Sequence, residues 1–164
     1  MKVFFDTEFP CIYSTTLDLI SAGFIADDGR ELYLEIADFD HEACSTFVLD
    51  TVLPLLDAPK ENVIPIKQFG LRLVEWLNAF DAPVELVCDF DDDRRLVEHF
   101  SATALAQLTY PPKWLVWAPN PSFEYKCANI SDEFWSAPQN IAMQHHALFD
   151  ARCLRHVFLT AHHL

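Results

Sequence analysis

The chain has 164 residues, 51% of them hydrophobic, and its 25 acidic residues against 11 Lys and Arg give a formal net charge of −14. This length predicts one domain, residues 1–164, with enough apolar side chains to bury a sizeable core. The acidic balance excludes a protein that coats long nucleic acid through its surface charge, so metal cations would have to neutralise part of any polyanion it handles.

Cysteine usage and hydropathy indicate a protein of the reducing cytosol. The five cysteines are widely spaced and form no CxxC pair, which argues against a zinc knuckle and a disulfide framework. No apolar stretch approaches the ~18 residues needed to span a bilayer. Asp6 and Glu8 also interrupt the apolar start before a signal-peptide core is complete. We therefore expect a cytoplasmic protein with no membrane segment.

The first predicted element is a buried strand that contains "FFDTEFP", residues 4–10. Because side chains alternate along a strand, Asp6 and Glu8 share a face with Phe4. Two carboxylates this close are costly unless one is protonated or a cation lies between them. The alternative is an amphipathic edge strand on which both carboxylates face water.

The next region predicts an antiparallel meander. Residues 17–39 contain two β-prone runs separated by Asp28-Gly29, a strong hairpin signal. Leu49, Val52 and Leu56 then show helical spacing, although Pro54 should end or kink that helix.

The second half of the chain predicts alternating helices and strands. The first is a helix over 64–80 whose apolar face consists of Phe69, Leu73, Trp76, Leu77 and Phe80. A buried strand over 84–90, a helix beginning within 91–100 and a strand over 113–119 follow. The chain then has a mostly irregular segment over 120–144 and a last helix that begins near His145. Together with the meander, this order predicts an α/β domain with a mixed five-stranded sheet and helices on its faces.

Two more acidic residues border apolar stripes of predicted helices. Asp93 lies at i, i+3, i+4 and i+7 spacing with Leu96, Val97 and Phe100, and it should tip toward the core where the preceding strand ends. Asp150 lies beside the apolar stripe of the last helix. The alternative for Asp150 is a surface ion pair with Arg152 or Arg155, but neither stands at i+3 or i+4 from it.

Asp6, Glu8, Asp93 and Asp150 are thus four acidic side chains aimed inward from three elements. Such a cluster is strongly destabilising unless it is compensated. Mg²⁺ and Mn²⁺ prefer carboxylate and water oxygens as ligands. The residues themselves therefore predict a divalent metal site.

These residues resemble the DEDDh branch of the 3′-to-5′ exonucleases, the superfamily of oligoribonuclease, RNase T and the proofreading subunit of DNA polymerase. Three motifs carry the resemblance in the family's chain order: "DTE" supplies Asp6 and Glu8, "DFDDD" supplies Asp93, and "HHALFDA" supplies His145 and Asp150. The third is similar to the family pattern H-x-A-L-x-D-A at each position. Among these enzymes, the sequence looks most like the small bacterial and phage exoribonucleases, including the mycobacterial type.

The sequence departs from the family pattern at two places. Phe9 and Pro10 follow "DTE" where Thr-Gly is common, and Cys88 and Asp89 stand where His-Asn is frequent. Asp89 precedes Asp93 by four, as that Asn often precedes the family's Asp, which favours Asp93 over Asp92 as the residue of the middle motif. Asp92 remains an alternative.

The resemblance implies an RNase H-like fold, two bound divalent ions (Mg²⁺ or Mn²⁺) and removal of nucleotides one at a time from a 3′ end. One ion would orient a water and the other would stabilise the departing 3′ oxygen, about 3.5 to 4 Å away. His145 would be the general base, because imidazole titrates near neutral pH. It lies five residues before Asp150 and should therefore stand on the loop that precedes the helix, with His146 as a solvent-facing neighbour.

We expect single-stranded RNA or an RNA 3′ end as the substrate, with DNA as an alternative. A homodimer is one candidate for the oligomeric state. Phe9 could stack on the terminal base. Five other aromatic residues could shape a groove, although each is more often core than contact: Trp114, Trp117, Phe123, Tyr125 and Trp135. Two alternatives stay open: a DNA-directed, proofreading-like exonuclease, and an inactive acidic protein of the same fold that binds a basic partner.

Overall fold

The computed structural model describes residues 1–11, 17–118 and 121–162, except for the side chains of residues 121–123 and 125. Its strands are β1 (Lys2–Glu8), β2 (Ser21–Ala26), β3 (Glu31–Ile36), β4 (Val63–Ile64), β5 (Glu85–Cys88) and β6 (Lys113–Val116). Its α-helices are α1 (Ile66–Leu77), α2 (Asp91–Leu105), α3 (Pro121–Ser136), α4 (Pro138–Ile141) and α5 (Ala147–His162). Within these ranges, every helix is too short or too polar to cross a lipid bilayer.

The strands form one mixed sheet in the order β4-β3-β2-β1-β5-β6. β1, β2 and β3 are antiparallel, whereas β5 is parallel to β1 and β6 is parallel to β5. The predicted meander and parallel crossovers are therefore confirmed. The predicted number of five strands is wrong, because β4 also pairs in parallel with β3. With only two residues, β4 is too short to show a period in the sequence.

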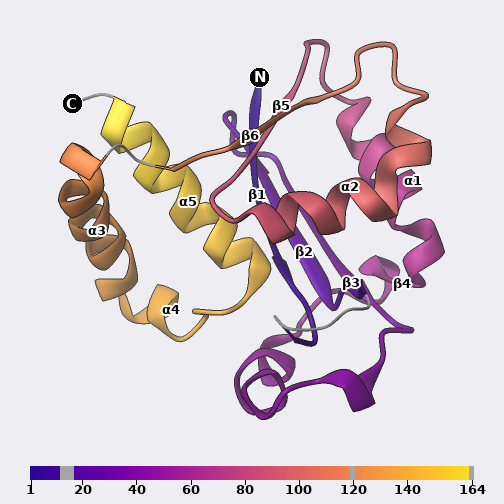
Figure 1. Ribbon diagram of the computed structural model, residues 1–164, viewed down its shortest axis with the longest axis horizontal. Helices are drawn as coiled ribbons and strands as arrows, with labels where there is room; N and C mark the ends of the chain where they lie inside the picture. Colours follow the sequence, from indigo (N-terminus) through magenta and orange to yellow (C-terminus); the bar gives the residue numbers. More distant parts are fainter. Residues whose placement is uncertain (12–16, 119–120, 163–164) are drawn as a thin grey trace.

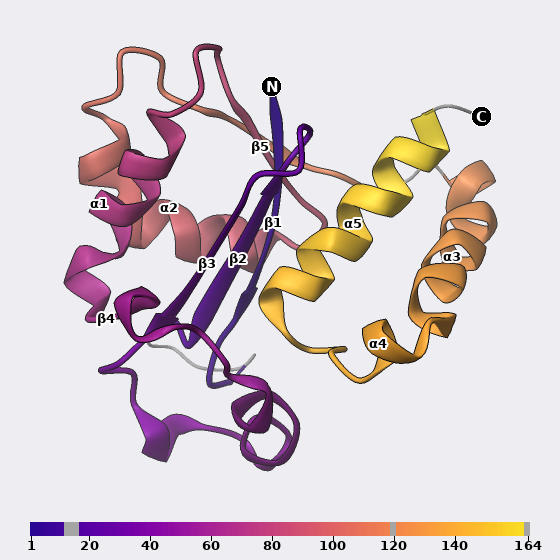
Figure 2. The same ribbon diagram turned by 180° about the vertical axis from the view of Figure 1, so that it is seen from behind.

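β1 lies at the centre of the sheet and not at an edge, and its two faces belong to different cores. Phe4 packs with Ala151, Leu154 and other α5 residues, whereas Phe5 lies in the larger core on the opposite face. Figures 1 and 2 show α5 on one face, with α3 beyond it, and α1 and α2 on the other. Helices cover both faces, as predicted.

The helix predicted over 64–80 is present as α1, and four residues of its predicted face are buried: Phe69, Leu73, Leu77 and Phe80. The hairpin at Asp28-Gly29 is also present. Gly29 has a φ of 88°, a left-handed conformation that glycine adopts without steric cost. Residues 48–55 are helical, but only as a π-helical turn (Val48–Val52) followed by a 3-10 turn (Leu53–Leu55) that contains Pro54.

The prediction of an irregular segment over 120–144 is wrong, because most of it forms α3 and α4. Cys127, Ile130 and Phe134, spaced three and four apart, pack against α5 with Cys153 and Val157. Pro121 and Pro138 stand at the first positions of α3 and α4, where proline does not interrupt a helix. The prolines therefore mark helix starts and not irregular structure.

Candidate active site

The site forms where the parallel strands β1 and β5 end. Asp6 and Glu8 lie on the α5 face of β1, both partly buried, and Thr7 between them lies on the other face. The carboxyl ends of parallel strands meet at the same edge of a sheet, so the residues that follow β5 lie near these carboxylates.

α2 begins at this edge and directs one of its three acidic residues inward. Asp93 is only 2% exposed and accepts a hydrogen bond of 2.5 Å from Thr7 Oγ1. Asp91 pairs with Arg94. Asp92 pairs with Arg95 on the surface. The structure thus places Asp93, and not Asp92, beside the β1 carboxylates.

α5 brings the fourth predicted carboxylate from its first turn. Asp150 is partly buried, and the surface ion pair considered above is absent. Arg152 instead pairs with Glu31. Arg155 donates to the backbone carbonyl of Asp27. Both arginines therefore reach the β2–β3 hairpin, which leaves Asp150 facing Asp6 and Glu8.

His145 lies on the loop just before α5, as predicted, with a φ of 71°. A non-glycine residue with positive φ is uncommon and indicates a backbone held by its surroundings. Its ring meets the ring of Phe47 edge-on at a centroid distance of 5.0 Å. Burial lowers the pKa of His145, so at neutral pH its ring is mainly in the neutral, proton-accepting form.

His146 is not the solvent-facing neighbour that the sequence predicts. It is 3% exposed, its Nε2 lies 3.1 Å from Asp57 Oδ1, and its ring packs on Tyr33 at 4.3 Å. The positive φ of His145 turns the chain here, so the next side chain points toward β3. Contacts with residues far away in the sequence, which no local pattern shows, therefore bury this ring.

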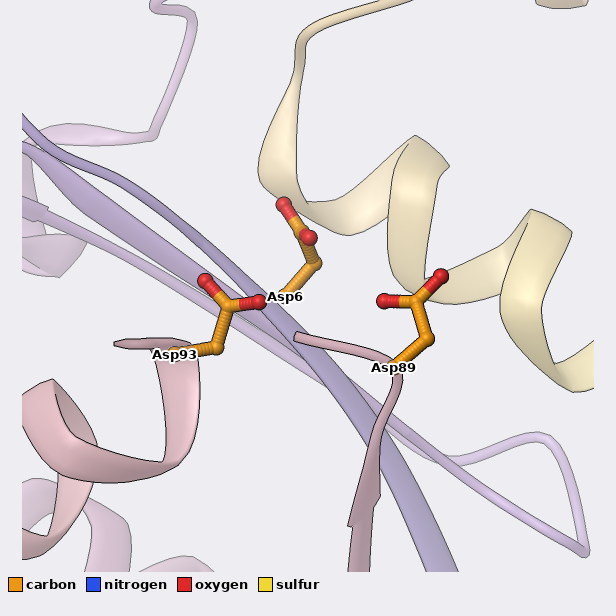
Figure 3. Close-up of side chains that lie close together, drawn as sticks. All are labelled: Asp6, Asp89 and Asp93. Atoms are coloured by element: carbon orange, nitrogen blue, oxygen red, sulfur yellow. The ribbon is translucent and has the colours of Figure 1, made fainter. Parts of the chain in front are cut away.

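The carboxylates form two groups of three that share Asp6. Asp6, Glu8 and Asp150 each offer an oxygen within 4.8 Å of the others, and the same holds for Asp6, Asp89 and Asp93. Figure 3 shows the second group converging from β1, from the end of β5 and from the start of α2. Asp89 is the residue that the sequence reasoning missed. The signal for it in the sequence is its position four residues before Asp93, where the family pattern often has Asn.

Burial and mutual repulsion raise the pKa values of these carboxyl groups. Desolvation is the largest cause at each: it raises the pKa of Glu8 to about 9 and those of Asp93 and Asp150 to about 7, and the pKa of Asp6 lies well above its usual range. Repulsion from Asp93, Asp150 and Glu8 adds to the shift at Asp6. The folded chain therefore holds these groups at a cost that a bound cation would remove.

This cost predicts a pH dependence of stability without metal. A carboxyl group whose pKa is raised on folding binds protons more tightly in the folded state, so the free energy of unfolding falls as pH rises from about 4 through the folded pKa values. We expect stability in EDTA to decrease between pH 5 and pH 8, and D93N to weaken this decrease. Urea denaturation across this range measures it.

The matched control for this experiment is D91N, two positions earlier on the same helix. Asp91 is exposed and its pKa is lowered by its hydrogen bond to Arg94, so its removal should leave the decrease between pH 5 and pH 8 unchanged. Equal slopes for D93N and the parent would contradict the inward-facing carboxylate cluster.

A cavity of about 820 Å³ surrounds these groups. Its described lining includes Phe9, and also Phe47 and Phe90, which are 52% and 47% exposed. It contains six carboxylates and neither Lys nor Arg among the residues that the structure describes. Phosphate charge would therefore have no cationic side chain to meet it inside the cavity.

The other aromatic candidates divide between core and cavity. Trp114 packs edge-on against Phe5 in the larger core, so it does not shape the cavity. Trp117 and Trp135 line it. Phe123 and Tyr125 lie outside the described side chains.

A solved structure with the same architecture belongs to the DEDDh class. The nuclease domain of 3′hExo, described as a DEDDh family member bound to rAMP, matches 99% of this chain and 91% of that chain with a TM-score of 0.58 and 12% sequence identity. At this identity the likeness concerns the fold, and it confirms the predicted RNase H-like α/β class.

The sequence comparisons add a likeness to two particular proteins. Both are named 3′-5′ exoribonuclease and come from the CDC 1551 / Oshkosh and H37Rv strains of Mycobacterium tuberculosis. They are 32% identical over 96 residues, which cover 49% of this chain and 56% of theirs. The chain thus matches little more than half the length of these relatives. No family model matches the chain. The predicted resemblance is therefore supported in fold by a DEDDh nuclease domain and in sequence, over part of the chain, by two proteins named 3′-5′ exoribonuclease.

Proposed function

We propose that the protein is a metal-dependent 3′-to-5′ exonuclease that hydrolyses the terminal phosphodiester bonds of single-stranded RNA, or of RNA 3′ overhangs, and releases nucleoside 5′-monophosphates. The observation that carries this proposal is the pair of three-carboxylate groups that share Asp6. The names of the mycobacterial relatives and the fold of 3′hExo support it.

The donor atoms fit hard divalent cations. Both groups offer only oxygen ligands, which Mg²⁺ and Mn²⁺ prefer over the softer metals that histidine and cysteine bind. Asp6, Glu8 and Asp150 would hold one ion, and Asp6, Asp89 and Asp93 would hold the other. Two ions bound in this way supply the charge that orients an attacking water and stabilises the departing 3′ oxygen. The raised pKa values fit this assignment, because burial and mutual repulsion disfavour the charged carboxylates unless a cation compensates them.

His145 would act as the general base. It borders the same cavity as Asp6 and Asp150, and its ring contacts that of Phe47. A neutral imidazole nitrogen accepts the proton of the attacking water, and burial, which lowers the pKa of His145, favours this neutral form. The resulting imidazolium would lie beside the acidic cavity, which stabilises its positive charge.

The cavity mouth favours an unpaired strand as the substrate. Without Lys or Arg in the described lining, affinity for the chain beyond the terminal phosphate must come from other contacts. Phe9, Phe47 and Phe90 offer aromatic faces for base stacking, which requires bases that are not enclosed in a duplex. Single-stranded 3′ ends present such bases.

F90A should raise the KM for a short RNA oligomer by about tenfold while kcat falls little, since stacking on an aromatic ring contributes roughly 1–3 kcal/mol per base. Steady-state kinetics on a labelled oligomer measure both constants. Y110A is the matched control, because Tyr110 is 66% exposed but does not line the cavity. An unchanged KM in F90A would remove Phe90 from the substrate contacts.

Incubation of 5′-labelled RNA and DNA oligomers with Mg²⁺ or Mn²⁺ tests the proposed function. A ladder that shortens RNA from its 3′ end, and disappears in EDTA, is the expected result. Faster shortening of DNA would favour the proofreading-like alternative instead. Intact RNA and DNA with both metals would overturn the proposal.

A further inference from the structure

Gly23 is the partner of Asp6 in the β1–β2 register, and its Cα faces the backbone of α5. A Cβ at this position would lie 2.3 Å from the Cα and N atoms of Leu148 and 2.5 Å from the carbonyl carbon of Ala147. Ordinary contacts of a Cβ begin near 3.4 Å. All three neighbours are backbone atoms, so no side-chain rotation can relieve the overlap. Any residue larger than glycine must move α5 away from β2 by about 1 Å.

This close approach concerns the first turn of α5, which carries Asp150. The helix continues close to the sheet beyond it, since Ala147 and Ala151 are both completely buried. The Asp150 carboxylate has an oxygen within 4.8 Å of those of Asp6 and Glu8. Metal–ligand distances vary by only about 0.2 Å, so a displacement of about 1 Å is large for such a site.

We propose that Gly23 is a positioning residue of the metal site. By having no side chain, it lets α5 contact β2 and so sets the distance from Asp150 to Asp6 and Glu8. This inference rests on the proposed function, because it assumes that these three carboxylates bind an ion. It assigns a role in metal binding to a residue that has no ligand atom of its own.

The full chain offers a control with a milder overlap on the opposite face of the sheet. Gly70 of α1 meets α2 closely: a Cβ there would lie 2.9 Å from the Cα of Ser101 and 3.0 Å from the carbonyl oxygen of Phe100. G23A and G70A should therefore both lose stability through overpacking. Ser101 lies about two helical turns from Asp93, so G70A disturbs a region remote from the carboxylates.

Calorimetric titration with Mn²⁺ separates the two variants. We expect G23A to bind Mn²⁺ at least tenfold more weakly than the parent and G70A to bind within twofold of it. Kinetics provide a second measure: raising the Mn²⁺ concentration should restore much of the kcat of G23A. Parent-like Mn²⁺ affinity in G23A, or an equal loss in G70A, would overturn the inference.

Two further outcomes are distinguishable. If the parent itself binds no Mn²⁺, the proposed function fails, whatever G23A does. If G23A does not fold, A151V tests the same displacement from the helix side. Ala151 lies on the face of α5 that packs on the sheet, so a larger side chain there would also push the helix away. A151V should also weaken Mn²⁺ binding at least tenfold, and parent-like binding in this variant would overturn the role of helix placement.

Discussion

D6N should lower kcat by at least about 10³-fold and, at the same time, make the metal-free protein more stable. Asp6 belongs to both carboxylate groups among the described residues, so its replacement removes a ligand from each ion. The charge stabilisation supplied by bound metals amounts to several kcal/mol, which corresponds to a factor of this size. Asparagine has nearly the same shape, so the loss would reflect charge and not packing.

The gain in stability of D6N comes from the removal of a buried carboxyl group that is costly to ionise. Without metal, burial and four neighbouring carboxylates raise the pKa of Asp6 well above its usual range, so folding at neutral pH carries the cost of this group. Asparagine removes that cost, so the free energy of unfolding in EDTA should be higher for D6N than for the parent at pH 8. The gain should shrink as pH falls toward and below about 4, because the carboxyl group then becomes protonated in the unfolded state as well.

Urea denaturation in EDTA and kinetics in Mn²⁺ test the two halves of this prediction. D28N is the control: Asp28 is exposed and hydrogen-bonded to Arg30, so its loss should slightly lower stability and leave kcat unchanged. A D6N protein clearly less stable than the parent in EDTA would mean that Asp6 is satisfied in the fold without a metal.

The predicted site residues follow from short-range periodicity. A period of two places Asp6 and Glu8 on one face of β1, and a period of 3.6 directs Asp93 and Asp150 toward the core. These relations involve only neighbours within one turn or one pleat, so they can be read before the fold is known. His145 was identified by its motif, and its position before α5 agrees with that motif.

The missed features depend on contacts between distant segments. Asp89 follows the end of β5, where no period fixes the direction of a side chain, and only the parallel pairing with β1 brings it near Asp6. His146 is buried by Tyr33 and Asp57, and Asp57 is 89 positions away. Phe47 reaches the cavity from the short helical segment that leads into Val48–Val52, and its side chain is half exposed, so no apolar stripe marks it. Such placements follow from tertiary packing and cannot be derived from local spacing.

The second large effect is expected at His145. H145N should lower kcat by about 10²- to 10⁴-fold, the usual contribution of a general base, while Mn²⁺ affinity stays within twofold of the parent. Asparagine is the preferred replacement because it tolerates positive φ better than alanine, so the loop with its φ of 71° should be preserved. The variant therefore tests the ring and not the backbone.

Kinetics and Mn²⁺ titration on the same preparation distinguish a base from a ligand. The parent should lose activity at acidic pH as the imidazole becomes protonated, and H145N should lack this part of the profile. H99A provides the control, because His99 is exposed on α2 and outside the cavity, and its kcat should match the parent. A fall in kcat of less than tenfold would assign the proton transfer to another group. A parallel loss of Mn²⁺ affinity would instead give the His145 ring a role in the metal site itself.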